Sequence, residues 1–444
     1  MLKTPPPSVL KIAELIRATS ASTNLNEAII LKEAKKLQKN WAGSSPPHAY
    51  LHLPRAKKPV INGTGIILHT GLGRAPLGSH VIERINQTLS SYIDLEFDLQ
   101  TGKRGKRTAY LDALFETLNS FYKPVWTNNC ASAVLLTLST LKKTGLYQSV
   151  IMSRGEMVEI GGGFRIPEIM EEAGLKILEV GTTNRTSLKD FEKALKKWGP
   201  AIVCRVSPSN FTIEGFTESV EPFKLSTLCK KYRSPLLYDA GTLNGDELKR
   251  LPKGFDFVMS SCDKTFGGPQ GGLICTTIKW QKLVLENPLF RAFRLEKISL
   301  VALEAALECH AMKTDRERIP VSHMLNSNLA QLEERVSRLL EKSDYKNFNL
   351  AKVSCVGSLG GGSTAHAKLP SLGLQIRPKT DDEKRGISTV SFSAANIVRR
   401  LRLGHTSLLL TVTDTFPTIN LMTVFKDQDA KLLEALQHLD QTLS

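Results

Sequence analysis

Short apolar runs alternate with amphipathic stretches between about residues 59 and 300. The runs cover residues 150–153, 175–180, 201–206, 235–238 and 256–260, and amphipathic segments at 187–198 and 224–232 lie between some of them. Most of the runs are continuously apolar, which is expected of strands that helices cover on both faces. The pattern predicts a large α/β domain, residues 59–300, with a mostly parallel sheet.

The segments on either side predict two smaller units. Residues 1–58 contain two short amphipathic stretches, one near 9–16 and one ending near Lys39, and residues 41–47 have the composition of a linker. Beyond a helical stretch at 297–342, we expect strands at 348–356, 373–376, 407–412 and 419–424, with helices at 393–402 and 428–443. The pattern therefore predicts a helical N-terminal domain and a small C-terminal α+β domain, residues 301–444.

Charge is concentrated at the N-terminus. The chain has 444 residues and a formal net charge of +16, and residues 1–58 hold ten Lys or Arg against three Glu. Such an excess favours a polyanionic partner such as nucleic acid, although a generally basic enzyme would have the same composition.

Composition also narrows the classes of protein. The seven cysteines are scattered without a Cys-x-x-Cys pair, so we expect a reducing cytoplasm rather than a disulfide framework. No apolar run is long enough for a membrane span, and no Cys/His cluster predicts a metal site.

Two strand ends carry the main chemical signal. The apolar run 235–238 leads into Asp239, and the run 256–260 leads through Ser261 to Lys264 and a glycine cluster. Parallel α/β sheets bind ligands beyond the carboxyl ends of their strands. An amine and a carboxylate at that edge suit pyridoxal 5'-phosphate (PLP), which forms an imine with a lysine and needs an acid beside its ring nitrogen. Taken singly, Asp239 could cap a helix and Lys264 could be a surface lysine.

A phosphate site is predicted at the start of the helix that follows residue 128. Asn129, Cys130 and Ala131 would present free backbone amides and the positive end of the helix dipole to a phosphate. Helix capping alone would also explain these residues. We place Ser261 with them as a cofactor-binding candidate.

Three arginines are candidates for a second anion site. Arg291 and Arg294 are three residues apart, which predicts one helix face, and Arg74 lies in a Gly-rich loop. If they converge they would bind an oxyanion, whereas an ordinary charged helix would show the same spacing. Ser261 and Lys264 match the Ser-x-x-Lys of penicillin-binding enzymes, but the partner motifs of that class are missing or out of order.

At these residues the chain resembles the bacterial selenocysteine synthases, the L-seryl-tRNA(Sec) selenium transferases. The resemblance rests on Asp263-Lys-Thr-Phe-Gly-Gly-Pro-Gln270 and on residues 60–77, 99–105, 153–167 and 180–185. It implies a fold-type I PLP enzyme in which Lys264 binds the cofactor and Asp239 contacts its pyridine nitrogen. It also implies that Arg74, Arg291 and Arg294 hold the selenophosphate-derived anion.

The resemblance implies a reaction in two halves. Seryl-tRNA(Sec) loses water to give an aminoacrylyl intermediate, and selenium from selenophosphate then adds to it. The N-terminal domain would bind the selenocysteine tRNA, and the protein would be a cytoplasmic homo-oligomer, a ring of dimers.

Two other functions remain open from the residues alone. One is a related PLP-dependent lyase that acts on a small amino sugar or amino acid without tRNA, and the other is an inactive tRNA-binding scaffold. The segment 239–245, Asp-Ala-Gly-Thr-Leu-Asn-Gly, departs from the Asp-Leu-Gly-Ser-Gly usual in the family. Asn420-Leu-Met-Thr-Val424 likewise stands where the family tends to have Asp-Leu-Arg-Thr-Val.

Overall fold

The computed structural model describes residues 7–17, 26–39, 57–160, 163–207, 211, 213–312, 318–360, 368–379 and 392–443. It divides the chain into two compact units, Met1–Pro59 and Val60–Ser444. In the first unit, α1 (Val9–Arg17) and α2 (Glu27–Lys39) pack through a small buried cluster that includes Ile12, Ile16 and Ile30. The predicted linker at 41–47 lies outside the described residues.

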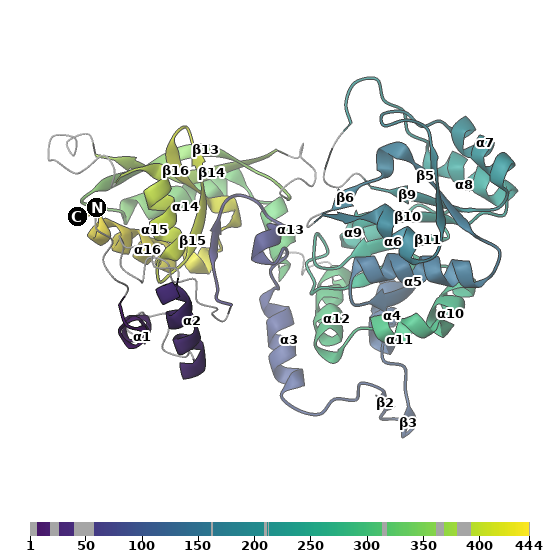
Figure 1. Cartoon of the computed structure of the whole chain (residues 1–444), viewed down its shortest axis with the longest axis horizontal. Helices are drawn as coiled ribbons and strands as arrows, with labels where there is room; N and C mark the ends of the chain where they lie inside the picture. Colours follow the sequence, from purple (N-terminus) through teal and green to yellow (C-terminus); the bar gives the residue numbers. More distant parts are fainter. Residues whose placement is uncertain are drawn as a thin grey trace. The chain divides into compact units, whose positions relative to one another are not determined.

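A seven-stranded sheet forms the larger half of the second unit (Figure 1). Its strands, in spatial order, are β4 (Lys123–Thr127), β12 (Gly272–Thr276), β11 (Phe257–Ser261), β10 (Leu236–Thr242), β9 (Ile202–Val206), β5 (Ser149–Ser153) and β8 (Lys176–Val180). The strands from β11 to β8 run parallel, and β12 is antiparallel to both of its neighbours. This confirms the predicted mostly parallel sheet and adds the two strands β4 and β12, which the apolar runs did not predict.

Helices bury both faces of this sheet. One face packs against α5 (Cys130–Lys143), α6 (Ile166–Glu172), α10 (Ile278–Glu286) and α11 (Pro288–Phe293). The other packs against α3 (Ser79–Leu89), α4 (Ala109–Leu118), α7 (Leu188–Trp198), α8 (Pro222–Lys231), α9 (Gly245–Lys249) and α12 (Lys297–Ala311). Neighbouring strand residues such as Ile202 and Val203 alternate between the two clusters, which explains why the runs are continuously apolar.

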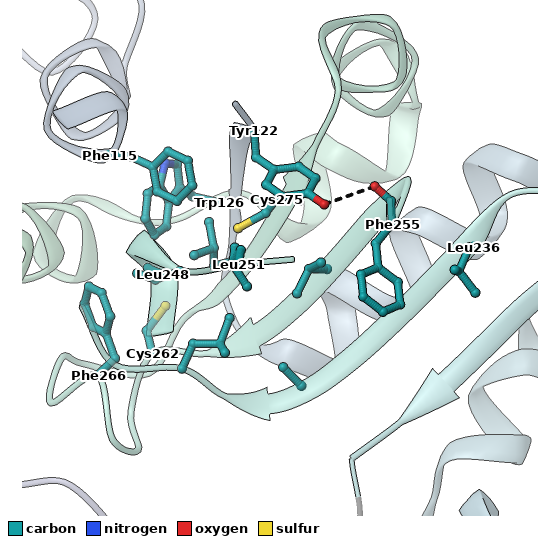
Figure 2. Close-up of a cluster of buried hydrophobic side chains, with 14 of the residues drawn as sticks. Phe115, Tyr122, Trp126, Leu236, Leu248, Leu251, Phe255, Cys262, Phe266 and Cys275 are labelled. Carbon is teal, nitrogen blue, oxygen red and sulfur yellow. Dashed lines mark hydrogen bonds between the residues drawn. The ribbon is translucent and has the colours of Figure 1, made fainter. Parts of the chain in front are cut away.

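Aromatic side chains fill the second of these clusters (Figure 2). Phe115 and Trp126 meet edge to face with ring centroids 6.1 Å apart. The Tyr122 hydroxyl, on a fully buried side chain, donates to the carbonyls of Pro252, at 2.8 Å, and Phe255, at 3.3 Å. The polar end of this tyrosine is therefore satisfied, and the core supports strands β10 and β11, which carry the predicted site.

The C-terminal half holds a second sheet of five strands. In spatial order these are β1 (Ile61–Gly63), β15 (Leu408–Thr413), β16 (Phe416–Asn420), β14 (Leu369–Pro378) and β13 (Phe348–Gly357). The helices α14 (Leu329–Glu341), α15 (Ala394–Leu403) and α16 (Asp429–Thr442) share its buried core. Strand β1 pairs in parallel with β15, so residues just after position 59 contribute a strand to the C-terminal sheet.

The predicted strand at 419–424 is wrong in its bounds. Strand β16 ends at Asn420, whose side chain accepts from the backbone of Met422 at 3.1 Å. That bond caps a short 3₁₀ turn, Leu421–Thr423, and an asparagine that bonds its own downstream backbone favours a turn over a strand.

Shorter elements complete the described chain. They are the hairpin strands β2 (Phe97–Asp98) and β3 (Lys103–Arg104), the pair β6 (Glu159–Ile160) and β7 (Phe164–Arg165), the helix α13 (Pro320–Leu325) and the 3₁₀ turns Thr70–Leu72, Arg154–Glu156 and Lys426–Gln428. Among the described residues, no helix is long and apolar enough to cross a membrane. The same residues contain no group of His, Cys, Asp and Glu that could hold a metal ion.

Candidate active site

The structure brings Asp239 and Lys264 together on one glycine. Lys264 Nζ donates to the carbonyl of Gly241 at 3.3 Å, and the amide of Gly241 donates to Asp239 Oδ1 at 2.9 Å. Gly241 has φ +66°, a backbone angle that residues with a side chain rarely adopt. The register of β10 against β11 shifts between Asp239 and Thr242. This irregularity lets the amine, just beyond the end of β11, and the carboxylate lie beside the same residue. Strand β10 continues through Asp239 to Thr242, so the acid lies inside the strand and not at its predicted end.

Asp239 is a buried carboxylate with little local compensation. Its residue is 6% exposed, and burial raises the pKa of the carboxyl group. The Gly241 amide and the charge of Lys264 act in the opposite direction but do not overcome the burial. A carboxylate in this state fits a cationic hydrogen-bond donor, such as a protonated ring nitrogen.

The start of α5 has the features that the predicted phosphate site requires. Asn129 caps the helix, because its Oδ1 accepts from the amide of Ser132 at 2.8 Å. The amides of Cys130 and Ala131 are the first two of the helix and have no intrahelical carbonyl to bond. They are free to bind an anion at the positive end of the helix dipole.

Cys130 connects this helix start to the acid. Its Sγ lies 3.9 Å from Asp239 Oδ1. Burial, together with the neighbouring charge of Asp239, raises the pKa of the Cys130 thiol well above its ordinary value. The thiol therefore stays protonated and can donate weakly to the carboxylate.

Gly272 leaves room for the helix start to approach the sheet. A Cβ at this position would lie 2.2 Å from the carbonyl oxygen of Asn129 and 2.5 Å from Thr127 Oγ1. Only glycine fits such a close backbone approach. The amine of Lys264, the buried acid Asp239 and the amide-rich start of α5 thus match the aldehyde, ring nitrogen and phosphate of PLP.

The segment that departs from the family pattern supports the lysine. Thr242 Oγ1 lies 2.6 Å from Thr265 Oγ1 and accepts from the Thr265 amide at 3.0 Å. Thr265 directly follows Lys264, so these two threonines fix the backbone beside the amine. The sequence did not predict them, because the signal is a contact between residues 23 positions apart, one at the end of β10 and one in the turn after β11.

Arg74 is paired with the residue that precedes the predicted lysine. Its NH1 donates to Asp263 Oδ2 at 2.9 Å, and the amide of Ala75 donates to the carbonyl of Asp263 at 3.2 Å. Ser261 Oγ donates to the other carboxylate oxygen of Asp263 at 2.7 Å. Asp263, absent from the predicted set, thus joins Arg74 and Ser261 one residue before Lys264.

The prediction of one helix face for Arg291 and Arg294 is wrong. Helix α11 ends at Phe293, and Arg294 is extended, with φ −63° and ψ 150°. The carbonyl of Phe293, the last residue of α11, accepts from the amide of Asn128 at 2.7 Å, so its hydrogen-bond partner lies outside the helix. Arg294 therefore comes one residue after a contact with the phosphate-site loop, while Arg291 is exposed on the last turn of α11.

The arginines are held by different groups. Arg294 NH1 donates to Glu96 Oε1 at 3.2 Å, and Arg74 is paired with Asp263. Among the described residues, no hydrogen bond or ion pair connects Arg291 to another side chain. The structure places Arg74 and Arg294 near different parts of the site without a contact that joins them.

Comparison with known proteins agrees with this geometry. The family model described as SelA, L-seryl-tRNA selenium transferase, matches residues 60–412. The chain is 35% identical over 397 residues to an L-seryl-tRNA(Sec) selenium transferase of Aquifex aeolicus (strain VF5), covering 86% of this chain and 84% of that protein. It is 34% identical over 436 residues to the Clostridium perfringens (strain ATCC 13124) protein of the same name, covering 94% and 91%.

A solved structure shares the architecture. The D-glucosaminate-6-phosphate ammonia-lyase aligns with a TM-score of 0.59 and 17% identity, over 87% of this chain and 97% of that chain. This likeness concerns the fold alone, and it agrees with the predicted fold-type I architecture. Together with the matches over most of its length, it leads to one assignment: the chain belongs to the L-seryl-tRNA(Sec) selenium transferase family.

Proposed function

We propose that this protein converts L-seryl-tRNA(Sec) to selenocysteinyl-tRNA(Sec) with PLP as its cofactor. The observation that carries the proposal is the meeting of Lys264 and Asp239 on Gly241, beside the start of α5. The relatives that match most of the chain are named for this reaction. PLP, when bound, supplies an electron sink for reactions at the substrate carbon beside the amine.

Each residue of the site has a distinct task. Lys264 Nζ attaches the cofactor and, when free, moves a proton to or from the substrate carbon. Asp239 holds a proton on the ring nitrogen, because a buried carboxylate is stabilised by a cationic donor. The amides of Cys130 and Ala131 bind the phosphate, and Thr242 fixes the backbone next to the lysine.

The selenium donor would bind to the arginines. Selenophosphate is an oxyanion, and guanidinium groups bind oxyanions through paired N–H donors. Arg74 is paired with Asp263, the residue before Lys264, and Arg294 follows the residue that contacts Asn128. These positions support roles for Arg74 and Arg294 in the second half of the reaction, and Arg291 completes the proposed set.

The N-terminal unit would bind the tRNA. In α2 the buried side chains Ile30 and Ala34 face α1, and Lys32, Lys35 and Lys39 are exposed. Exposed lysines attract a phosphate backbone. We further propose the division into domains 1–58, 59–300 and 301–444, with the exception that β1, inside 59–300, pairs with the C-terminal sheet. We also propose a cytoplasmic location and assembly into a ring of dimers.

The direct test is conversion of purified seryl-tRNA(Sec) in the presence of selenophosphate. We expect selenocysteinyl-tRNA(Sec) from the wild-type protein and none from Lys264→Ala. Deletion of residues 1–58 should abolish the gel shift with this tRNA at moderate salt, while the remaining protein still binds PLP. If the wild-type protein neither shifts the tRNA nor forms product, the proposal is wrong, and the lyase alternative would have to be tested with small amino acids and amino sugars.

A further inference from the structure

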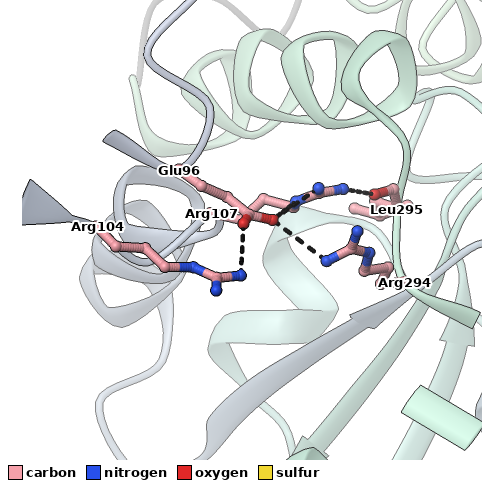
Figure 3. Close-up of polar contacts among 5 residues, drawn as sticks. All are labelled: Glu96, Arg104, Arg107, Arg294 and Leu295. Carbon is pink, nitrogen blue, oxygen red and sulfur yellow. Dashed lines mark hydrogen bonds and ion pairs between the residues drawn. The ribbon is translucent and has the colours of Figure 1, made fainter. Parts of the chain in front are cut away.

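A single carboxylate connects three arginines beside the proposed anion site (Figure 3). Glu96 Oε2 accepts from Arg104 at 2.8 Å. Its Oε1 accepts from Arg107 Nε at 3.0 Å and NH2 at 2.7 Å, and from Arg294 NH1 at 3.2 Å. Glu96 directly precedes the β2–β3 hairpin, which carries Arg104, whereas Arg294 lies far along the chain between α11 and α12.

Arg107 fixes this carboxylate in place. Two bonds join it to Glu96, and its NH1 donates to the carbonyl of Leu295 at 2.7 Å. Leu295 is buried in the core and is the residue after Arg294. The chain of contacts therefore returns to the backbone beside Arg294, so Glu96 is held rigidly with respect to that arginine.

Arg294 keeps most of its donors. Only its NH1 bonds Glu96, and this bond is the longest of the set. The Nε and the second amino group of Arg294 have no bond to another of the described residues. The pKa of Glu96 is lowered, first by the hydrogen bond from Arg107, so the carboxylate is charged at neutral pH. The three guanidinium groups nevertheless outnumber this one carboxylate, so the cluster remains positive.

We propose that Glu96 is a positioning residue for Arg294, which it orients through one edge of the guanidinium so that the other edge binds the phosphate-like group of the selenium donor. This rests on the proposed function for the identity of the donor. Glu96 itself does not touch the substrate. A rigidly held arginine loses less side-chain entropy when it binds an anion, so the orientation raises affinity although the carboxylate is negative.

The direction in which Glu96→Gln changes anion affinity distinguishes an orienting role of Glu96 from a purely electrostatic one. Glu96→Gln removes the negative charge and leaves an amide whose NH2 group opposes a guanidinium. If Glu96 acted only through its charge, the substitution would make anion binding tighter. If it orients Arg294, loss of the charge-assisted bond should weaken anion binding about tenfold, the equivalent of one hydrogen bond to a charged group.

The experiment measures binding of inorganic phosphate to the PLP-loaded enzyme by titration calorimetry, in which the cofactor already fills the phosphate site at α5. The variants are Glu96→Gln, Glu96→Asp and the control Arg104→Gln, whose side chain is 76% exposed and bonds Glu96 but not Arg294. We expect a clear loss of affinity for Glu96→Gln, at most the small loss due to one exposed positive charge for Arg104→Gln, and recovery of most of the affinity in Glu96→Asp. In turnover, KM for selenophosphate should rise about tenfold for Glu96→Gln while the tRNA affinity is unchanged.

Three results would overturn the proposal. Phosphate could bind Glu96→Gln as tightly as wild type or more tightly, Arg104→Gln could weaken binding equally, or the wild-type holoenzyme could fail to bind phosphate at all. Equal effects of the two variants would mean that docking of the hairpin alone matters. Failure of the proposed function is seen separately, as the absence of selenocysteinyl-tRNA from the wild-type protein whatever its phosphate affinity.

Discussion

Replacement of Asp239 by asparagine should make the cofactor-free protein more stable and the cofactor-loaded protein less active. The buried carboxylate of Asp239 accepts one backbone bond, from Gly241 at 2.9 Å, and a weak contact from Cys130 Sγ at 3.9 Å. Asparagine keeps an oxygen for the Gly241 amide and removes the charge. We therefore expect Asp239 to destabilise the cofactor-free fold, a cost that its proposed role at the ring nitrogen would explain.

The expected magnitude follows from these contacts. Desolvation of a buried ion costs several kcal/mol, and one hydrogen bond to a charged group returns roughly 1.5–3 kcal/mol. We therefore expect Asp239→Asn to stabilise the apoenzyme by about 1–2 kcal/mol. From the average unfolding entropy per residue, this corresponds to an increase in Tm of about 1–3 °C for the unit Val60–Ser444.

The increase in stability that Asp239→Asn gives the apoenzyme should grow as the pH rises. Because the folded-state pKa of Asp239 is raised, the folded protein binds a proton more tightly than the unfolded chain does. The stability that protonated Asp239 contributes is fully present below its pKa in the unfolded chain, about 3.9. This stability is lost as the pH rises through the higher pKa of the folded protein. The advantage of Asp239→Asn over the wild-type apoenzyme should therefore appear above about pH 4 and grow with pH.

The assay is thermal unfolding of the apoenzymes across pH, together with PLP titration. Asp239→Asn should bind PLP about 10- to 100-fold more weakly, since it loses a bond between charged groups. Asp256→Asn is the matched control. Asp256 also has a pKa raised by burial, and it accepts from the amide of Leu236 at the opposite end of β10. We expect this control to retain PLP binding. An Asp239→Asn apoenzyme that is less stable than wild type, or that binds PLP equally well, would refute the reasoning.

Three further outcomes are expected. Lys264→Ala should remove the absorbance band near about 420 nm that attached PLP produces, and a persistent band would exclude Lys264 as the attachment site. Gly272→Ala should reduce PLP affinity at least about tenfold in equilibrium dialysis, because its Cβ would lie 2.2 Å from the Asn129 carbonyl; unchanged affinity would mean that the helix start shifts freely. Glu308→Gln should destabilise the protein by about 2–4 kcal/mol in denaturant unfolding, since the 4% exposed carboxylate accepts two bonds from Arg84, at 3.0 and 2.9 Å; a loss below about 1 kcal/mol would contradict this.

Local sequence was sufficient for the centre of the site. Asp239 and Lys264 each follow an apolar run, and the parallel order of β10 and β11 places the ends of those runs at one edge of the sheet. The start of α5 was predictable for the same reason, because the capping residue and the free amides belong to one short segment. Strand and helix periodicity is a local property, so these parts need no long-range information.

Contacts between residues far apart in the chain could not be predicted from the sequence. Arg294 was expected on a helix face, but α11 ends one residue earlier, at Phe293. The carbonyl of Phe293 bonds the amide of Asn128, which lies outside the helix. The pairing of Arg294 with Glu96 joins positions 198 residues apart, and that of Arg74 with Asp263 joins positions 189 apart. Charge spacing along a chain says nothing about such partners.

The sequence by itself determined the fold class, the candidate pair Lys264 and Asp239 that we propose as cofactor lysine and acid, and the basic character of the N-terminal unit. Only the tertiary structure decided that Lys264 and Asp239 meet on Gly241, that Thr242 supports the lysine and that Glu96 holds Arg294. Apolar periodicity is written into each segment because every strand and helix must bury its own face. Side-chain orientation at the site depends on which segments pack together, and that is settled only when the whole sheet and its helices have formed.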